Sequence, residues 1–129
     1  MASKSTCPCG SGLPAQHCCG PLLAGQHRAD TAVQLMRSRY CAYVQHDAAY
    51  LRASWHPDTR PAEIGFDDTI KWLGLKIIAT VAGGAGDETG EVEFVARYKI
   101  NGRGFRLHEN SRFVRHRGDW VYVDGDSRQ

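Results

Sequence analysis

Four of the five cysteines in this chain lie within thirteen residues near its N-terminus, in the segment Cys7 to Cys19, which reads CPCGSGLPAQHCC. Cys7 and Cys9 are separated by one residue, whereas Cys18 and Cys19 are adjacent. A segment this short and this poor in apolar residues cannot bury a hydrophobic core of its own. Four thiolates around one soft cation would order it instead, so the spacing predicts a metal site.

The ligands that we expect are Cys7, Cys9, Cys18 and Cys19, and the metal that we expect is zinc. Zinc favours tetrahedral thiolate ligation, and four protein ligands leave no open position for water, so such a site would hold structure and not catalyse. Three alternatives remain open. They are a disulfide pair, an iron–sulfur cluster, whose usual cysteine spacings differ from this one, and His17 in place of one cysteine.

Composition indicates a soluble globular chain and a reducing compartment. Hydrophobic residues make up 42% and charged residues 23% of the 129 residues, which is ordinary for such proteins. The opening residues MASKST carry no hydrophobic stretch of a secretory signal, and no apolar run approaches the roughly 20 residues that span a bilayer. We therefore expect a cytoplasmic protein, where clustered cysteines bind metal more often than they form disulfides.

The first half of the remaining chain has helical periodicity. Residues 31–46 repeat apolar residues every three or four positions after a cap at Asp30 or Thr31, which predicts one buried helix face. Asp47 predicts the cap of a second helix, which ends before Pro57. Asp67 or Asp68 is expected to cap a short third helix through residue 73.

The second half alternates with a period of two, which predicts strands. We expect four strands. The first begins at Leu75, the second covers residues 91–100, the third follows a turn at Asn101-Gly102, and the fourth covers residues 120–124. The final residues, 125–129, are expected to fray. Asn-Gly is a strong signal for a two-residue hairpin. A tight turn there pairs Tyr98 with Phe105 and Phe94 with Glu109, and this register sets apolar residues opposite one another at most pairs.

Together these elements predict an α+β fold with two units. Residues 1–20 form a zinc knuckle, of which residues 1–6 are a polar tail expected to be disordered. Residues 21–129 form a domain in which two or three helices pack on one face of a four-stranded antiparallel sheet.

The segment CPCGSGLPAQHCCG resembles the SEC-C motif, a zinc-binding knuckle first recognised at the C-terminus of the translocation ATPase SecA. This chain has Ala15 where that motif usually has an aromatic residue. The segments GPLLAGQ, LMRSRYCAYV, VEFVARYKINGR, HENSRFV and WVYVDG extend the resemblance over nearly the whole chain, to the YchJ-like family. The resemblance implies a cone-shaped, nuclear-transport-factor-2-like (NTF2-like) domain behind the knuckle. By analogy with SecA, it also implies a protein or ribosome-associated partner for the knuckle.

A second candidate site lies on the sheet face that should meet the helices. Alternation places the carboxyl group of Glu109 on this apolar face, which is costly unless the group is paired. One interpretation is a ligand pocket of Glu109 with Trp55, His56 and Tyr98. The other is a structural pair with Arg37 or Arg39, or a bulge that turns Glu109 outward. The segment MRSRY is expected to lie on a solvated helix face, with an arginine that reaches off the helix and braces the sheet as the alternative. Cys41 is expected to be a small buried residue of the helix.

The opposite sheet face should be basic, with Arg97, Lys99, Arg106, His108 and Arg112 pointing the same way. Such a face can bind phosphate backbones, but it lacks the aromatic side chains that stack on bases. A solvated face with cross-strand ion pairs such as Glu91–Arg112 is therefore favoured over nucleic-acid binding.

Two functions follow from these features. The first is a binding module in which structural zinc shapes a docking surface for a protein or ribonucleoprotein. The second is a small-molecule-binding or enzymatic pocket in the α+β cone, using Glu109 and His56. The sequence has no phosphate-binding loop, dinucleotide fingerprint or metalloprotease helix motif, and no catalytic residue is assigned.

Overall fold

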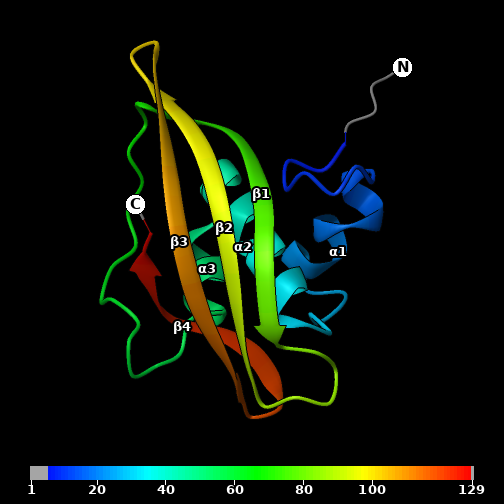
Figure 1. Ribbon diagram of the computed structural model, residues 1–129. Helices are drawn as coiled ribbons and strands as arrows, with labels where there is room; N and C mark the ends of the chain where they lie inside the picture. The colour runs from blue at the N-terminus through cyan, green and yellow to red at the C-terminus, as the bar shows by residue number, and fades with distance from the viewer. Residues whose placement is uncertain (1–5, 129) are drawn as a thin grey trace.

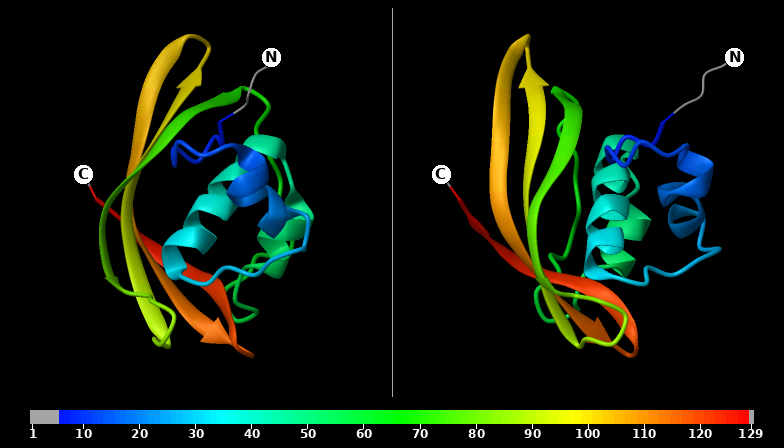
Figure 2. Two further views of the ribbon diagram at one scale, coloured as in Figure 1. Left: turned by 90° about the vertical axis from the view of Figure 1, so that its right-hand side faces the viewer. Right: turned by 45° about the vertical axis from the view of Figure 1, so that its right-hand side comes forward.

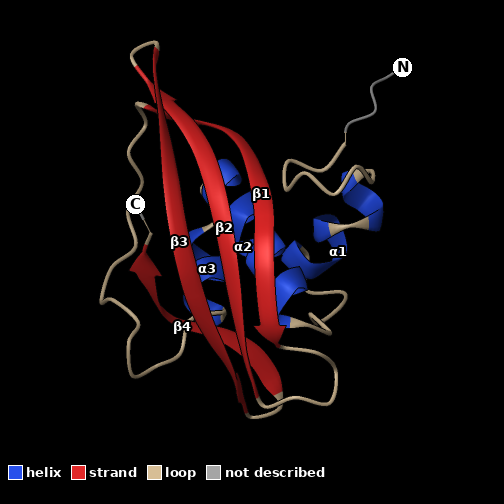
Figure 3. Ribbon diagram, in the orientation of Figure 1, coloured by secondary structure: helices blue, strands red, loops and turns tan. Residues whose placement is uncertain are grey.

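The computed structural model describes residues 6–128. A four-stranded antiparallel sheet dominates this part of the chain, in the order β1-β2-β3-β4. Its strands are β1 (Ile70–Ala82), β2 (Thr89–Ile100), β3 (Arg103–His116) and β4 (Asp119–Ser127). Figure 3 shows these long, curved strands as one meander. The predicted α+β class and the four-stranded sheet are confirmed, and residues 1–5 of the predicted tail lie outside the described residues.

The helices form two further layers on one side of the sheet. Helices α2 (Ala32–Gln45) and α3 (Ala48–Ala53) lie against the concave face, and the short α1 (Cys19–Leu23) lies beyond α2 (Figures 1 and 2). The side chains of Thr31 and Asp47 accept hydrogen bonds from the backbone N–H groups of Gln34 and Tyr50. These contacts confirm the predicted helix caps.

The central hairpin has the predicted register. Asn101 and Gly102 both adopt positive φ, as the tight turn requires. Tyr98 then lies opposite Phe105, and Phe94 lies opposite Glu109. Glu109 is therefore on the sheet face that meets α2.

The helix predicted after Asp67 or Asp68 is wrong, because strand β1 already begins at Ile70. The Asp67 carboxylate accepts hydrogen bonds from the backbone N–H and hydroxyl of Thr69, which forms a local turn and caps no helix. A register shift between Trp72 and Gly74 puts Trp72 and Leu75 three residues apart on the same face. This bulge imitates helical spacing and conceals the strand.

The fraying predicted for residues 125–129 is also wrong over 125–127, which belong to β4. Ser127 pairs with Glu109, and the backbone N–H of Arg128 donates to the carbonyl of His108 at 2.7 Å. Arg112 holds this end through ion pairs with Asp124 and Asp126, at 2.6 and 2.7 Å. Cross-strand charges therefore extend the strand beyond its apolar part.

Helix α2 is buried on more than the predicted single face, because the knuckle and α3 pack against it in addition to the sheet. Arg39 is only 3% exposed, so the solvated helix face predicted for MRSRY is wrong. The buried cluster joins Cys7, Cys9 and Cys19 to residues of α2 and the sheet. Within residues 6–128 no helix is long and apolar enough to cross a membrane.

Candidate metal centre and ligand cavity

A small closed loop positions the first two cysteines. The backbone N–H of Cys7 donates to the carbonyl of Leu13 at 2.7 Å, and that of Gly10 donates to the carbonyl of Cys7 at 3.2 Å. Gly10 adopts φ +82°, and a Cβ there would lie 2.7 Å from the Leu75 carbonyl oxygen. Glycine at this position therefore allows both the turn and its close approach to β1.

The second pair lies where the 3-10 turn η1 (Ala15–His17) meets α1. Cys18 ends this turn with an irregular backbone conformation, and Cys19 is the first residue of α1. The four sulfur atoms of Cys7, Cys9, Cys18 and Cys19 all lie within 4.8 Å of one another. The Sγ atoms of Cys9 and Cys18 are 3.6 Å apart, and those of Cys18 and Cys19 are 3.9 Å apart.

These separations suit one ion inside the cluster. Four sulfurs each about 2.3 Å from a zinc ion, in tetrahedral geometry, would lie roughly 3.8 Å apart. Cys7, Cys9 and Cys19 are buried, and Cys18 is half-buried. The described residues therefore include a four-thiol cluster that could hold a metal ion, with one side towards solvent. His17 is exposed and is not part of this cluster.

Neighbouring side chains hold and polarise the sulfurs. The Ser11 hydroxyl lies 3.2 Å from the Cys18 sulfur, and Arg37 of α2 donates to the Cys9 carbonyl at 2.7 Å and to its sulfur at 3.7 Å. Hydrogen bonding from the Cys19 and Cys41 thiols lowers the pKa of Cys9, whereas burial raises the pKa of Cys18. Outer contacts of this kind commonly tune metal–thiolate sites.

A fifth thiol, Cys41, lies beside the cluster. It is 1% exposed on α2, as predicted, but its sulfur lies only 3.4 Å from that of Cys7. Sequence reasoning missed this contact because 34 residues separate the two cysteines. Only the helical spacing from Arg37 to Cys41, four residues on one helix face, could have linked both residues to the knuckle.

A groove of about 530 Å³ runs beside the knuckle. Its walls include Ser11, Leu13, His17, Cys18 and Arg37. Leu13 is 50% exposed at the end of the cysteine loop. The groove therefore combines an exposed apolar side chain with polar walls and reaches the least buried sulfur.

A separate cavity of about 260 Å³ lies between α2 and the sheet. Helix α2 contributes Arg39, Tyr40 and Tyr43, and the strands contribute Trp72, Glu109 and Tyr122 among others. The cavity therefore has aromatic walls that also carry one basic side chain, Arg39, and one acidic side chain, Glu109.

Of the four residues predicted for a pocket, Glu109 lines this cavity, whereas Trp55, His56 and Tyr98 lie outside its walls. Trp55 packs edge-on against Tyr122, with 5.2 Å between the ring centroids, and its buried Nε1 has no hydrogen-bond partner within residues 6–128. His56 contacts His116, and Tyr98 stacks on Phe105. The structure thus does not gather these four side chains into one site.

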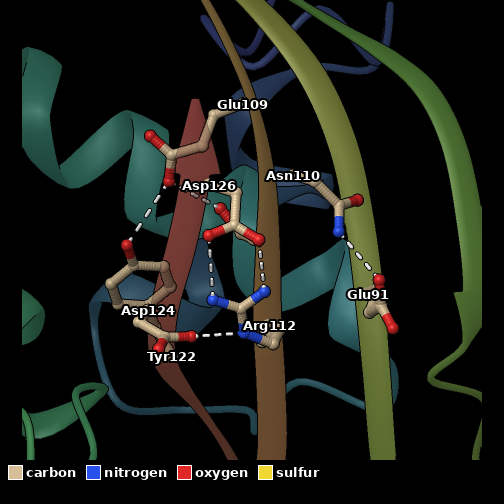
Figure 4. Close-up of polar contacts among 8 residues, drawn as sticks. Glu91, Glu109, Asn110, Arg112, Tyr122, Asp124 and Asp126 are labelled. Atoms are coloured by element: carbon tan, nitrogen blue, oxygen red, sulfur yellow. Dashed lines mark hydrogen bonds and ion pairs between the residues drawn. The ribbon is translucent and has the colours of Figure 1, made fainter. Parts of the chain in front are cut away.

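The carboxyl group of Glu109 is half-buried and bonded to hydroxyl groups (Figure 4). Ser111 Oγ and Tyr122 Oη donate to its Oε2 at 3.2 and 3.4 Å. Burial and the nearby Glu109 carboxylate raise the pKa of Tyr122. No ion pair joins Glu109 to Arg37 or Arg39, two described residues that were expected as partners.

The basic outer sheet face is partly neutralised. Arg112 pairs with Asp124 and Asp126 (Figure 4) in place of the expected Glu91, and His108 lies 2.7 Å from Glu93. Glu91 instead accepts from Asn110 at 2.8 Å. Arg97, Lys99 and Arg106 remain exposed, and Arg97 lies directly opposite Arg106.

Comparison with known proteins identifies both parts of the chain. The family model described as the middle NTF2-like domain of YchJ matches residues 31–125, and the SEC-C motif model matches residues 4–21. The chain is 50% identical to a UPF0225 protein of Streptomyces avermitilis, over 95% of this chain and 84% of that protein. It is 51% identical to the UPF0225 protein SCO1677 of Streptomyces coelicolor, over 93% and 94%.

Two solved structures have the same fold. The solution structure of a SEC-C motif protein from Rhodopseudomonas palustris aligns with a TM-score of 0.82 and 34% identity, covering 95% of this chain and 98% of that chain. The crystal structure of a SEC-C motif protein from Psychrobacter arcticus aligns with a TM-score of 0.77 and 27% identity, covering 98% and 85%.

Proposed function

The chain belongs to the YchJ-like family of UPF0225 proteins, in which a SEC-C motif precedes an NTF2-like domain, and on this premise we propose that it is a cytoplasmic binding module. Cys7, Cys9, Cys18 and Cys19 hold one structural zinc ion, and the knuckle shaped by that ion docks a protein partner. The reducing cytoplasm keeps the thiols available for the metal.

The observation that carries the proposal is the exposed Leu13 beside the groove at Cys18. Leu13 and part of the groove wall lie on the loop that the four sulfurs close, so the metal would fix the shape of this part of the surface. An ion with four protein ligands has no open position for substrate water, which favours a structural role over catalysis. An exposed apolar side chain at the wall of a groove offers a partner an apolar contact beside a recess, and exposed apolar surface of this kind commonly marks an interaction site.

Affinity purification from the native cell tests docking, with the full chain as bait. The Leu13→Gln variant removes the apolar anchor and leaves every cysteine in place, so it should lose the partner and keep its metal. Val81→Gln is the matched control, because Val81 is also exposed, at 61%, and lies at the far end of β1.

We expect wild type and Val81→Gln to recover the same protein, and Leu13→Gln and Cys18→Ser to fail to recover it. Recovery that is equal in all four baits would refute docking through the knuckle. Loss of the partner after nuclease treatment of the lysate would instead point to a ribonucleoprotein that is held through its RNA.

A further inference from the structure

The cavity between α2 and the sheet contains a buried positive charge without a negative partner. Arg39 is 3% exposed, yet no carboxylate within residues 6–128 forms an ion pair with it. Its Nη1 donates to the Leu51 carbonyl at 3.0 Å and to Ser54 Oγ at 2.7 Å. A buried ion without a counter-ion is costly, and such groups in folded proteins are normally paired.

Aromatic rings compensate for part of this cost. The guanidinium carbon of Arg39 lies 4.7 Å from the ring centroid of Trp55 and 4.6 Å from that of Tyr122. An aromatic ring attracts a cation that lies over its face. It does not accept the N–H groups that point outward in the plane of the guanidinium. Its hydrogen bonds to Leu51 and Ser54 both use Nη1, and the Tyr43 hydroxyl is a further hydrogen-bonding neighbour. A guanidinium has five N–H donors, so some of them remain available on a side chain that lines the cavity. Burial correspondingly lowers the pKa of Arg39.

Glu109 is the second charged group on the cavity walls, and it does not pair with Arg39. Tyr122 separates them, because its ring faces Arg39 while its hydroxyl donates to Glu109. The Glu109 carboxylate also fits against Gly125, where any Cβ would overlap its Oε2. The cavity therefore presents a cation and a hydrogen-bond acceptor at separate places on its walls.

We propose that this cavity binds a small aromatic acid that carries a hydroxyl or amino group at the end away from its carboxylate. The carboxylate pairs with the free donors of Arg39, since a guanidinium forms strong hydrogen bonds with a carboxylate. The distal hydroxyl or amino group donates to Glu109, and the ring packs among Tyr40, Tyr43 and Trp72. A volume of about 260 Å³ limits the ligand to one ring with short substituents.

Three probe molecules separate these contributions in the intact, metal-loaded chain. 4-Hydroxyphenylacetate has both polar ends, phenylacetate lacks the hydroxyl, and 4-methylphenol lacks the carboxylate. Titrations followed by amide chemical shifts should rank their affinities in that order. Shifts should concentrate on residues of α2 and the inner sheet face. No saturable shift with 4-hydroxyphenylacetate, or equal affinity for all three probes, would overturn the proposal.

Two variants assign the contacts. Arg39→Met should weaken both acids by at least about tenfold and leave 4-methylphenol unchanged, since it removes one charge-assisted contact. Arg115→Met is its matched control, because Arg115 also lies over a ring, 4.4 Å from the centroid of Trp120, but outside the cavity.

Glu109→Gln keeps the shape of the side chain, so it remains informative even if Arg39→Met fails to fold. It should weaken 4-hydroxyphenylacetate and leave phenylacetate unchanged. Equal effects of Glu109→Gln on both acids would show that Glu109 only stabilises the wall, and would contradict the proposed orientation.

Discussion

Individual residues decide whether the knuckle can form and where it attaches. Gly10 and Gly12 both adopt positive φ, at +82° and +85°, but only Gly10 lies against another element. A Cβ at Gly10 would press on the Leu75 carbonyl of β1, whereas a Cβ at Gly12 would have no neighbour within 4 Å. A side chain at Gly12 would therefore strain only the turn, whereas a side chain at Gly10 would strain the turn and also its packing against β1.

Alanine substitutions at these positions make that separation measurable. Gly12→Ala should lower the free energy of unfolding by about 1–2 kcal/mol, the cost of a left-handed alanine. Gly10→Ala should lower the free energy of unfolding by about 1–3 kcal/mol more than Gly12→Ala does, since the backbone of β1 must move. Urea unfolding of the metal-loaded chain measures both values. Equal losses would show that the loop does not rest on β1.

For single residues, the role can be predicted from the sequence where it depends on the spacing of near neighbours. The four clustered cysteines are visible in thirteen residues, and their sulfurs do come together. Cys41, Arg37 and Arg39 could not be placed in this way, because helix packing determines their surroundings. Arg39 is buried where the rings of Trp55, just after α3, and Tyr122 of β4 pack against its guanidinium group.

Among the elements, the hairpin was predictable and the ends of the outer strands were not. Asn101-Gly102 fixes the register of β2 and β3 locally, since the turn admits few alternatives. The start of β1 is concealed by a bulge, and the end of β4 depends on charges from a neighbouring strand. Both features depend on pairing with a neighbouring strand, which the periodicity of the segment itself does not record.

Arg112 should hold the last residues of β4, 125–127, in the sheet. Arg112→Gln removes the fork to Asp124 and Asp126, so amide hydrogen exchange at residues 125–127 should become faster. Arg106→Gln is the control on the same strand, because Arg106 is exposed and forms no ion pair with the described residues. Unchanged exchange in Arg112→Gln would mean that backbone pairing alone holds the strand end.

The same contact predicts a pH dependence. Hydrogen bonds from Arg112 lower the pKa of Asp126, so the contact stabilises the folded chain above the unfolded pKa of Asp126. This stabilisation is lost as the pH falls through the lower, folded pKa. Side-chain NMR titration of Arg112→Gln should therefore show Asp126 protonating at a higher pH than in wild type. An unchanged midpoint would refute the coupling.

In the whole molecule, the knuckle and the cone share one buried cluster. Cys7, Cys9 and Cys19 belong to the same cluster as Leu75, Val92 and Phe113 of the sheet. The cysteine spacing and the later periodicity predict a knuckle over residues 1–20 and a domain over 21–129, because neither pattern records contacts between segments. A metal at the cysteines would therefore stabilise both parts together.

Removal of the metal should accordingly affect the entire chain. Calorimetry with a strong zinc chelator should show one transition whose midpoint is lower by about 5 °C or more, since loss of metal ligation costs several kcal/mol. Added zinc should restore the original midpoint. A sheet transition that does not shift on chelation would show that the cone folds independently of the knuckle.

The docking surface and the shared buried cluster both depend on one zinc ion held by four thiolates. The most direct measurement is elemental analysis, with zinc-edge X-ray absorption, of protein purified without chelator. We expect one zinc per chain with four sulfur neighbours at about 2.3 Å. Another metal, less than about half an equivalent of zinc, or a nitrogen neighbour replacing a sulfur would contradict it.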